Sequence, residues 1–149
     1  MLGFTGNSIP KVDPVYGKAL MEKLSRAMSE GNVRACHDCS EGGMAVALAE
    51  MAFAGGLGME IKFKAADLPK LQEMLPEEKF LFSESNTRFI VEVADEKKFL
   101  KAMAGAPLWK LGLVSKSRAF RVTDFKGNII IDTTIDKLKE SWQSPFKGE

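Results

Sequence analysis

The chain has 149 residues, of which 45% are hydrophobic and 28% charged, and its formal net charge is +1. This composition is that of a soluble globular protein with material for one domain of ordinary size. The positive field of a general nucleic-acid binder is missing, so no nucleic-acid partner is expected. The longest small-apolar run, 44–49, is far shorter than the about 20 residues that cross a membrane. No secretory signal pattern is present, and a cytoplasmic protein without a membrane partner is expected.

The N-terminal part of the chain predicts a tail followed by a helix. Residues 1–12 show no clear hydrophobic period and are expected to form a tail or linker in front of a single domain, 13–149. Asp13 followed by Pro14 is typical of a helix start, because Asp caps the first turn and Pro suits its first position. The helix is expected to stop at Gly31, which has no Cβ and suits a left-handed cap.

The rest of the chain alternates between strands and helices. Residues 33–38 predict a short buried strand, and 44–53 predict a helix so apolar that it must be covered on more than one side. The further elements expected are strands at 59–63, 88–93 and 109–114, helices at 67–76 and 95–104, a hairpin of 120–124 and 129–132 around Lys126-Gly127, and a last helix that Thr133 and Asp136 cap and that ends near 144–145. This order predicts an α+β fold with one mixed β-sheet flanked by helices.

Two cysteines, Cys36 and Cys39, have the spacing C-x-x-C, which occurs in redox motifs and in half of a zinc site. A zinc site needs a second pair of ligands, but the sequence has no other Cys, and its one His, His37, lies between these two. A redox site needs the first Cys at a helix N-terminus, whereas the helix here is expected to begin after Gly43. Two buried, reduced thiols are therefore the favoured interpretation.

The first segment with the residues for chemistry is the glycine-rich loop 37–43, between the buried strand and the apolar helix. Gly42 and Gly43 are candidates for phosphate contact, since glycines let the backbone approach an anion and the first N–H groups of a helix lack internal partners. Asp38, at the strand end, is a candidate Mg²⁺ ligand. The alternative is structural: Ser40 caps the helix and the glycines only permit close packing.

The second such segment is the loop Ser83–Arg88, which places several polar side chains and one cation before a strand. Such a group orients a polar ligand by hydrogen bonds, with Glu84 as acceptor and Arg88 as donor. The alternative is a solvated turn in which Ser85 and Asn86 bond to nearby backbone, and the residues alone favour that alternative.

Both loops lie in longer segments that resemble one enzyme family. The segment 34–56, RACHDCSEGGMAVALAEMAFAGG, resembles the long signature near the end of formylglycinamide ribonucleotide amidotransferase, the synthetase subunit II of phosphoribosylformylglycinamidine synthase. The segment 81–89, LFSESNTRF, resembles that family's second signature at the expected distance. PKVDP at 10–14 and WQSP at 142–145 also match, so the resemblance covers nearly the whole chain.

The resemblance implies a fold and an activity. The family's enzyme uses ATP, Mg²⁺ and ammonia from glutamine to convert formylglycinamide ribonucleotide to the amidine in purine biosynthesis. Its synthetase resembles two fused copies of an N-domain and C-domain unit, related to aminoimidazole ribonucleotide synthetase, and this chain resembles the last C-domain, which is α+β and partly ferredoxin-like. The family's catalytic His and nucleotide-gripping segments lie in the other domains, so this chain is expected to be catalytically incomplete. Its expected partners are the remaining synthetase domains and a glutaminase subunit or domain.

The resemblance also implies roles for single residues. Asp38 corresponds to a Mg²⁺-binding loop, and Glu84, Ser85 and Asn86 correspond to a substrate-binding segment, although the second half of the fused enzyme is associated with an auxiliary nucleotide site. The alternative is a non-catalytic nucleotide- or partner-binding module of the same superfamily. Related ATP-using enzymes, such as selenophosphate synthetase, match the SESNTR run less well. Because a domain built for a larger enzyme leaves an apolar face uncovered, self-association into homo-oligomers is also expected.

Overall fold

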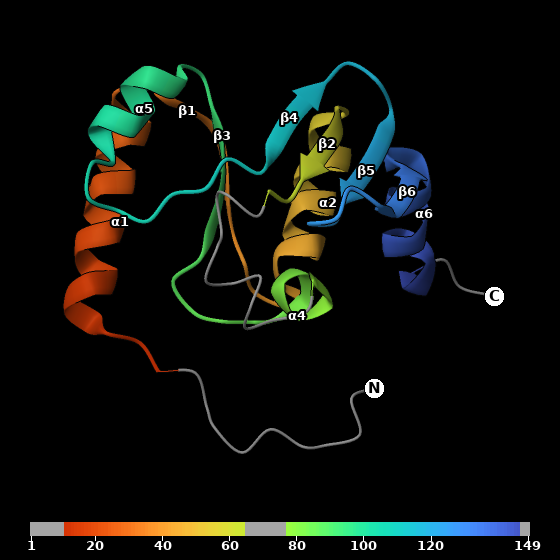
Figure 1. Ribbon diagram of the computed structural model, residues 1–149, viewed down its shortest axis with the longest axis horizontal. Coiled ribbons are helices and arrows are strands. Elements are labelled where there is room, and N and C mark those ends of the chain that lie inside the picture. Colours follow the sequence, from red (N-terminus) through yellow and green to blue (C-terminus); the bar gives the residue numbers. More distant parts are fainter. Residues whose placement is uncertain (1–10, 65–76, 147–149) are drawn as a thin grey trace.

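The structure is a computed structural model that describes residues 11–64 and 77–146 (Figure 1). The labels below are those of Figure 1. Along the chain, the elements are α1 (Pro14–Ser29), β1 (Val33–Asp38), α2 (Gly43–Gly55), β2 (Gly58–Lys62), α4 (Glu77–Phe82), β3 (Phe89–Val93), α5 (Glu96–Ala102), β4 (Gly112–Ser115), β5 (Ala119–Thr123), β6 (Ile129–Thr134), α6 (Ile135–Gln143) and the 3₁₀ turn η1 (Ser144–Phe146). No helix within the described residues is long and apolar enough to cross a membrane.

The strands form a mixed sheet and a separate pair. The four-stranded sheet has the order β4-β2-β5-β6, in which β2 and β5 are parallel and the outer pairings are antiparallel. Among the described residues, β1 and β3 pair only with each other, antiparallel, with Asp38 opposite Phe89. The predicted α+β fold with a mixed sheet and flanking helices is therefore confirmed, but the strands are divided between two sheets. Hydrophobic period identifies a strand and does not identify its partner, which explains the difference.

Helix α2 lies at the centre of the molecule, in contact with α4, α6 and both sheets (Figure 1). Six of its residues are buried, as the prediction of an apolar helix covered on several sides required. They join buried side chains of β2, β5 and α4, including Ile61, Phe120 and Leu81, in the larger of two hydrophobic clusters. Gly56 ends the helix with φ +67°. The main core thus surrounds the element that follows the glycine-rich loop.

The smaller hydrophobic cluster joins α1 and α5 to the β1–β3 pair. Leu24 and Ala27 of α1 meet Phe99 and Met103 at α5, on the left of Figure 1. The predicted start of α1 is confirmed, because Asp13 Oδ1 accepts hydrogen bonds from two amides of the first turn at 3.0 Å. The β1–β3 pair therefore has α1 and α5 on one side and α2 on the other.

Several element boundaries differ from those expected. Residues 80–82, for which the sequence predicted no element, end helix α4, while the short helix expected at 67–76 falls outside the described residues. The strand expected at 109–114 begins only at Gly112. The cap of α6 is Thr134, whose hydroxyl accepts the Lys137 N–H at 3.4 Å, rather than Thr133. These differences fall at element ends, where hydrophobic period carries little information.

The β5–β6 hairpin was predicted correctly and has a well-defined turn. Asp124 Oδ1 accepts the amide hydrogens of Lys126 at 2.8 Å and Asn128 at 2.7 Å, and Oδ2 accepts the Asn128 side-chain amide at 2.9 Å. Gly127 takes φ +90°, which favours glycine. The Asn128 side chain, and after it the backbone N–H groups, lower the pKa of Asp124.

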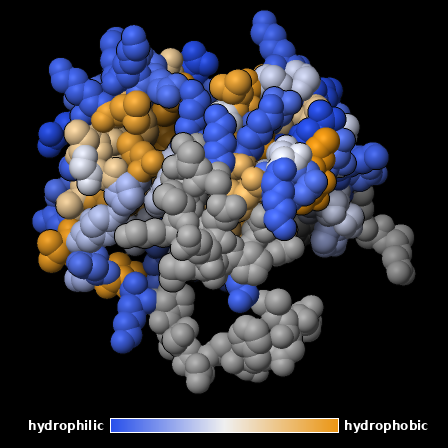
Figure 2. All heavy atoms as spheres, in the orientation of Figure 1, coloured by the Kyte–Doolittle hydropathy of each residue, from blue (hydrophilic) through white to orange (hydrophobic). Residues whose placement is uncertain are grey.

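Among the residues coloured by hydropathy in Figure 2, hydrophilic ones predominate, with separate groups of hydrophobic ones between them. The large hydrophobic side chains that are exposed in the described residues are Val12, Val15, Tyr16, Met21, Met28, Phe82, Leu100, Trp109, Leu113, Ile129, Ile130 and Trp142. They come from several elements. Self-association of the isolated chain through them stays a prediction.

Candidate functional site

A cleft of about 650 Å³ lies where β1 ends and β3 begins. Because Asp38 pairs with Phe89, the antiparallel register places the loop after β1 beside the loop before β3. The residues that line the cleft are Met21, Met28, Cys36, Asp38, Cys39, Ser40, Glu84, Asn86, Thr87, Arg88 and Phe89. One wall is therefore the α1 helix with its methionines, and the other consists of the two polar loops and the adjoining ends of β1 and β3.

The structure brings the two sequence motifs together. Of the residues singled out from the sequence, the cleft is lined by Asp38, Glu84, Asn86 and Arg88. Gly42, Gly43 and Ser85 do not line it. The shared position of the loops fits the expectation of one binding region, and the ligand roles of the individual residues stay predictions.

Gly42 and Glu84 meet in a single hydrogen bond. The Gly42 N–H donates to Glu84 Oε1 at 2.9 Å. Gly42 is the N-cap of α2, has φ +73° and lacks a capping side chain of its own, so the Glu84 carboxylate supplies the negative charge that a helix N-terminus favours. Ser40 does not cap the helix through its side chain. A phosphate on the Gly42 amide would therefore compete with a carboxylate of the protein.

Gly43 serves close packing. It is buried, with φ +65°, and a Cβ built there would lie 2.6 Å from the Ser83 carbonyl oxygen and 2.9 Å from that of Leu81. Its own N–H donates to the Ser40 carbonyl at 3.0 Å. The close packing that the structural alternative describes is present at Gly43, against the end of α4 rather than against a sheet. Contact of Gly43 with a phosphate stays a prediction.

Arg88 holds the second loop together. Its guanidinium donates to the carbonyl oxygens of Phe80 at 3.3 Å, Ser85 at 3.4 Å and Ser83. Its own carbonyl accepts the Cys39 N–H at 3.0 Å, which ties the loop to the segment after β1. A cation at the C-terminal end of α4 also complements the helix dipole. Arg88 therefore braces the loop, and its contact with a ligand stays a prediction.

The two thiols beside the cleft are free, as the sequence predicted. Burial raises the pKa of Cys36, and the negative charge of Asp38 adds to the rise. Burial also raises the pKa of Cys39, where the Arg88 charge partly opposes the effect and Asp38 reinforces it. Raised pKa values describe unreactive, protonated thiols. In the part of the chain that the structure describes, no group of three or more His, Cys, Asp and Glu side chains could hold a metal ion.

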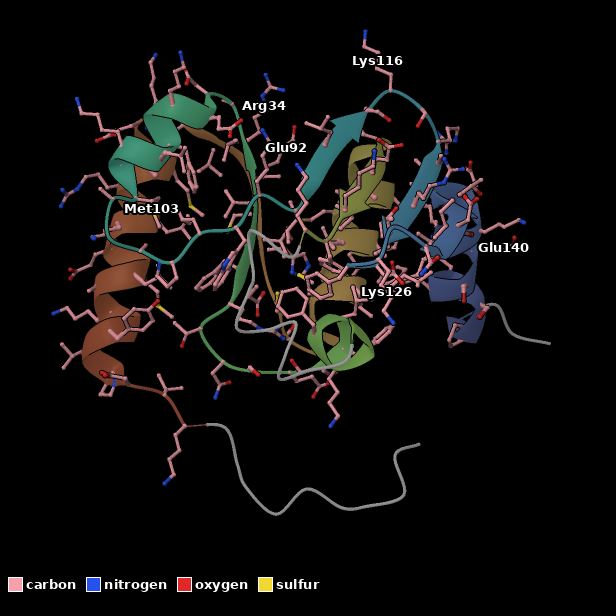
Figure 3. The ribbon with its side chains drawn as sticks, viewed as in Figure 1. Arg34, Glu92, Met103, Lys116, Lys126 and Glu140 are labelled. Carbon is pink, nitrogen blue, oxygen red and sulfur yellow. The ribbon has the colours of Figure 1, made fainter. Side chains whose placement is uncertain are left out.

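A second, mostly apolar groove of about 480 Å³ lies on the other side of β1. Its walls are Ala35, His37, Glu50, Met51, Phe53, Ala54, Gly55, Leu57, Met59, Glu92, Val114 and Trp142. Figure 3 shows Glu92 of β3 beside Arg34 of β1, and the two form an ion pair of 3.7 Å across the strands.

This groove has one polar chain of contacts that the sequence did not reveal. His37 Nε2 lies 3.1 Å from Glu50 Oε2, and Glu50 Oε1 accepts the Trp142 indole N–H at 3.1 Å. The Trp142 ring also packs on Phe53, with 5.7 Å between ring centroids. The strand alternation of β1 predicts that His37 lies on the groove side of the strand. Its other ring nitrogen, Nδ1, nevertheless lies 2.7 Å from the Asp38 carbonyl oxygen and 3.6 Å from Asp38 Oδ1. Its partners on α2 and α6 required the tertiary structure.

Comparison with known proteins identifies the class of this fold. Residues 2–125 match the family described as AIR synthase related protein, C-terminal domain, and the chain belongs to that family. Curated relatives are PurL subunits of phosphoribosylformylglycinamidine synthase. The chain is 39% identical to the Synechocystis sp. protein over 140 residues, covering 91% of this chain and 17% of that protein. It is 35% identical to the Caldanaerobacter subterraneus protein, covering 99% of this chain and 19% of that protein. The chain is thus homologous to PurL but spans less than a fifth of these relatives.

Solved structures agree on the fold. Thermotoga maritima PurL complexed with ATP matches with a TM-score of 0.69 and 25% identity, covering 87% of this chain and 23% of that chain. The T. maritima PurLQS structure matches with a TM-score of 0.71 and 22% identity, covering 88% of this chain and 23% of that chain. The predicted resemblance to the synthetase C-terminal domain is therefore confirmed.

Proposed function

We propose that this chain is the C-terminal domain of a PurL-type phosphoribosylformylglycinamidine synthase, the ATP-dependent ligase that forms an amidine in purine biosynthesis. In this proposal it works in the cytoplasm and supplies one wall of a ligand cleft. The observation that carries the proposal is the meeting of the two family signatures at the joined ends of β1 and β3, where Asp38, Glu84 and Asn86 line one hollow.

The hydrogen-bond donors of the cleft support the proposal that this domain needs a neighbouring domain to bind its ligand. A phosphorylated ligand requires cationic or N–H donors. The Arg88 guanidinium already donates hydrogen bonds to three carbonyl groups, and the Gly42 N–H already donates one to Glu84. The domain alone would therefore hold a phosphate weakly, and further donors would come from the remaining synthetase domains. We expect no turnover by the chain alone.

The carboxylates of the cleft fit a magnesium ion that is shared with a ligand. Mg²⁺ in ATP-using sites is usually held by one or two carboxylates together with phosphate oxygens. Asp38 is exposed and lines the cleft together with Glu84, so the cleft offers two carboxylates. The described residues contain no group of three or more side chains that could hold a metal ion without a ligand. Asp38 would hold the ion, which would neutralise phosphate charge. Glu84 would add a second ligand through Oε2, while Oε1 accepts the Gly42 amide hydrogen.

Partner subunits are part of the proposal. One structural neighbour is a PurLQS assembly from T. maritima, and several others are PurL complexes with nucleotides. By analogy, we propose that this domain works with the other synthetase domains and a glutaminase. The alternative is a non-catalytic nucleotide- or partner-binding module. The bond between Glu84 and Gly42 favours that alternative, because it closes the helix N-terminus with the protein's own carboxylate.

The test is calorimetric titration of the chain with ATP in the presence and absence of Mg²⁺. We expect weak, Mg²⁺-dependent binding, with a dissociation constant of about 1 mM, and a loss of about tenfold in Asp38→Asn. Glu140→Gln, which changes an exposed carboxylate on α6, is the matched control and should bind as the parent does (Figure 3). Two results would contradict the proposal: glutamine- or ammonia-dependent ADP release by the chain alone, and an ATP affinity that is unchanged in Asp38→Asn.

A further inference from the structure

Thr87 adopts a backbone conformation that its side chain disfavours. Its φ is +63°, and no other non-glycine residue in the ranges 11–64 and 77–146 has a positive φ. The left-handed region is uncommon for residues with a Cβ and is a genuine outlier for a β-branched one. Such strain persists only where the surrounding contacts over-determine the backbone, and it concentrates at ligand-binding sites.

Contacts on both sides of Thr87 enforce this conformation. Arg88, directly after it, is fixed by its three carbonyl contacts and by the bond from the Cys39 N–H to its own carbonyl. Glu84, three residues before it, is fixed by the Gly42 N–H. The loop is thus attached twice to the segment after β1. Thr87 lies between the two attachments, where the chain takes the tight turn that both require.

The side chain of Thr87 faces the opposite wall of the cleft. Gly17 of α1 is buried, and a Cβ placed on it would lie 3.8 Å from Thr87 Cγ2 and 3.9 Å from Oγ1. The loop therefore sits on α1 where that helix has no side chain. The same helix contributes Met21 and Met28 to the cleft. Thr87 and Gly17 therefore face each other where the polar wall approaches the methionine wall.

We infer that Thr87 is a positioning residue for the cleft. Its left-handed backbone presents Glu84 and Asn86 to the cleft, and its side chain seats the loop on α1 at Gly17. Thr87 acts through these neighbours rather than on a reacting atom. The inference rests on the proposed function for the nature of the ligand, but the loop geometry that it concerns is measurable without one.

The test compares Thr87→Gly with Thr87→Val. Glycine accepts the positive φ without strain but has no side chain to contact Gly17, whereas valine keeps the branched shape. For Thr87→Gly we expect an unchanged or higher melting temperature, about tenfold faster hydrogen exchange of the Gly42 amide, and about tenfold weaker MgATP binding. Thr87→Val should retain the parent's exchange rate and affinity.

Two results would overturn the inference. One is a Thr87→Gly variant in which the Gly42 amide exchanges at the parent's rate. The other is a variant in which stability falls and amides throughout the domain exchange faster together, which indicates a general structural role. If the parent binds no MgATP while Thr87→Gly still accelerates Gly42 exchange selectively, the proposed function fails and the positioning role stands.

Discussion

The two hollows on either side of β1 are built in different ways. The polar cleft takes Cys36 and Asp38 from the strand, and the apolar groove takes Ala35 and His37. The two loops of the cleft are joined by a backbone bond from Cys39 to Arg88 and by the bond from the Gly42 N–H to the Glu84 carboxylate. The groove is instead closed by side chains of α2 and α6, which pack around the hydrogen bond between Trp142 and Glu50. Four consecutive residues therefore serve two environments. The shape of the cleft thus depends on the backbone geometry of its loops, and the shape of the groove depends on side-chain packing.

The largest expected effect is a loss of stability at the cleft, where the backbone geometry of the loops is tested. Gly43→Ala places a Cβ against two carbonyl oxygens at a positive φ, and we expect unfolding free energy to fall by about 3 kcal/mol in urea titrations. Gly55→Ala, at the other end of α2, meets nothing within 4 Å and should change stability by less than about 1 kcal/mol. Equal losses in both variants would show that the α2–α4 approach is not tightly constrained.

At the groove, where side-chain packing matters, we expect a smaller loss of stability. Trp142→Ala removes the packing on Phe53 and the bond to Glu50, and should lower the free energy of unfolding by about 1.5 kcal/mol. Trp109→Ala, at an exposed tryptophan outside both hydrophobic clusters, should cost about 0.5 kcal/mol or less. MgATP affinity should not change in either variant. A loss of affinity in Trp142→Ala would mean that the two hollows are coupled.

Acid tests a region that belongs to neither hollow. The pKa of Asp124 is lowered in the folded protein, so its stabilisation is complete above the unfolded pKa of about 3.9 and is lost as the pH falls through the lower folded value. Hydrogen bonds from Arg118 lower the pKa of Asp136 in the same sense. In melting curves recorded below about pH 5, Asp124→Asn should show a flatter decline than the parent. An unchanged pH profile would remove the hairpin turn as a source of acid sensitivity.

The sequence revealed the fold class and both loops but not their contacts. Helix α2, the start of α1 and the β5–β6 hairpin followed from apolar period, an Asp-Pro cap and a Gly turn, which are local signals. The pairing of β1 with β3 joins residues far apart in the chain, and no local pattern carries that information. The same limit applies to the site: Gly42 and Glu84 were both assigned to ligand binding, and their bond to each other appears only when the loops are brought together.

The smallest expected effect is a change in the alkylation rate of Cys36, which tests whether β1 separates the cleft from the groove. Because burial and Asp38 raise the pKa of Cys36, little thiolate is present at pH 7.5, and iodoacetamide should modify it more slowly than a model thiol. Asp38→Asn removes a negative charge, lowers the thiol pKa and should speed the reaction about twofold. Glu50→Gln, which removes a carboxylate on the groove side of β1, should leave the rate unchanged. An equal response to both substitutions would mean that β1 does not isolate the cleft from the groove.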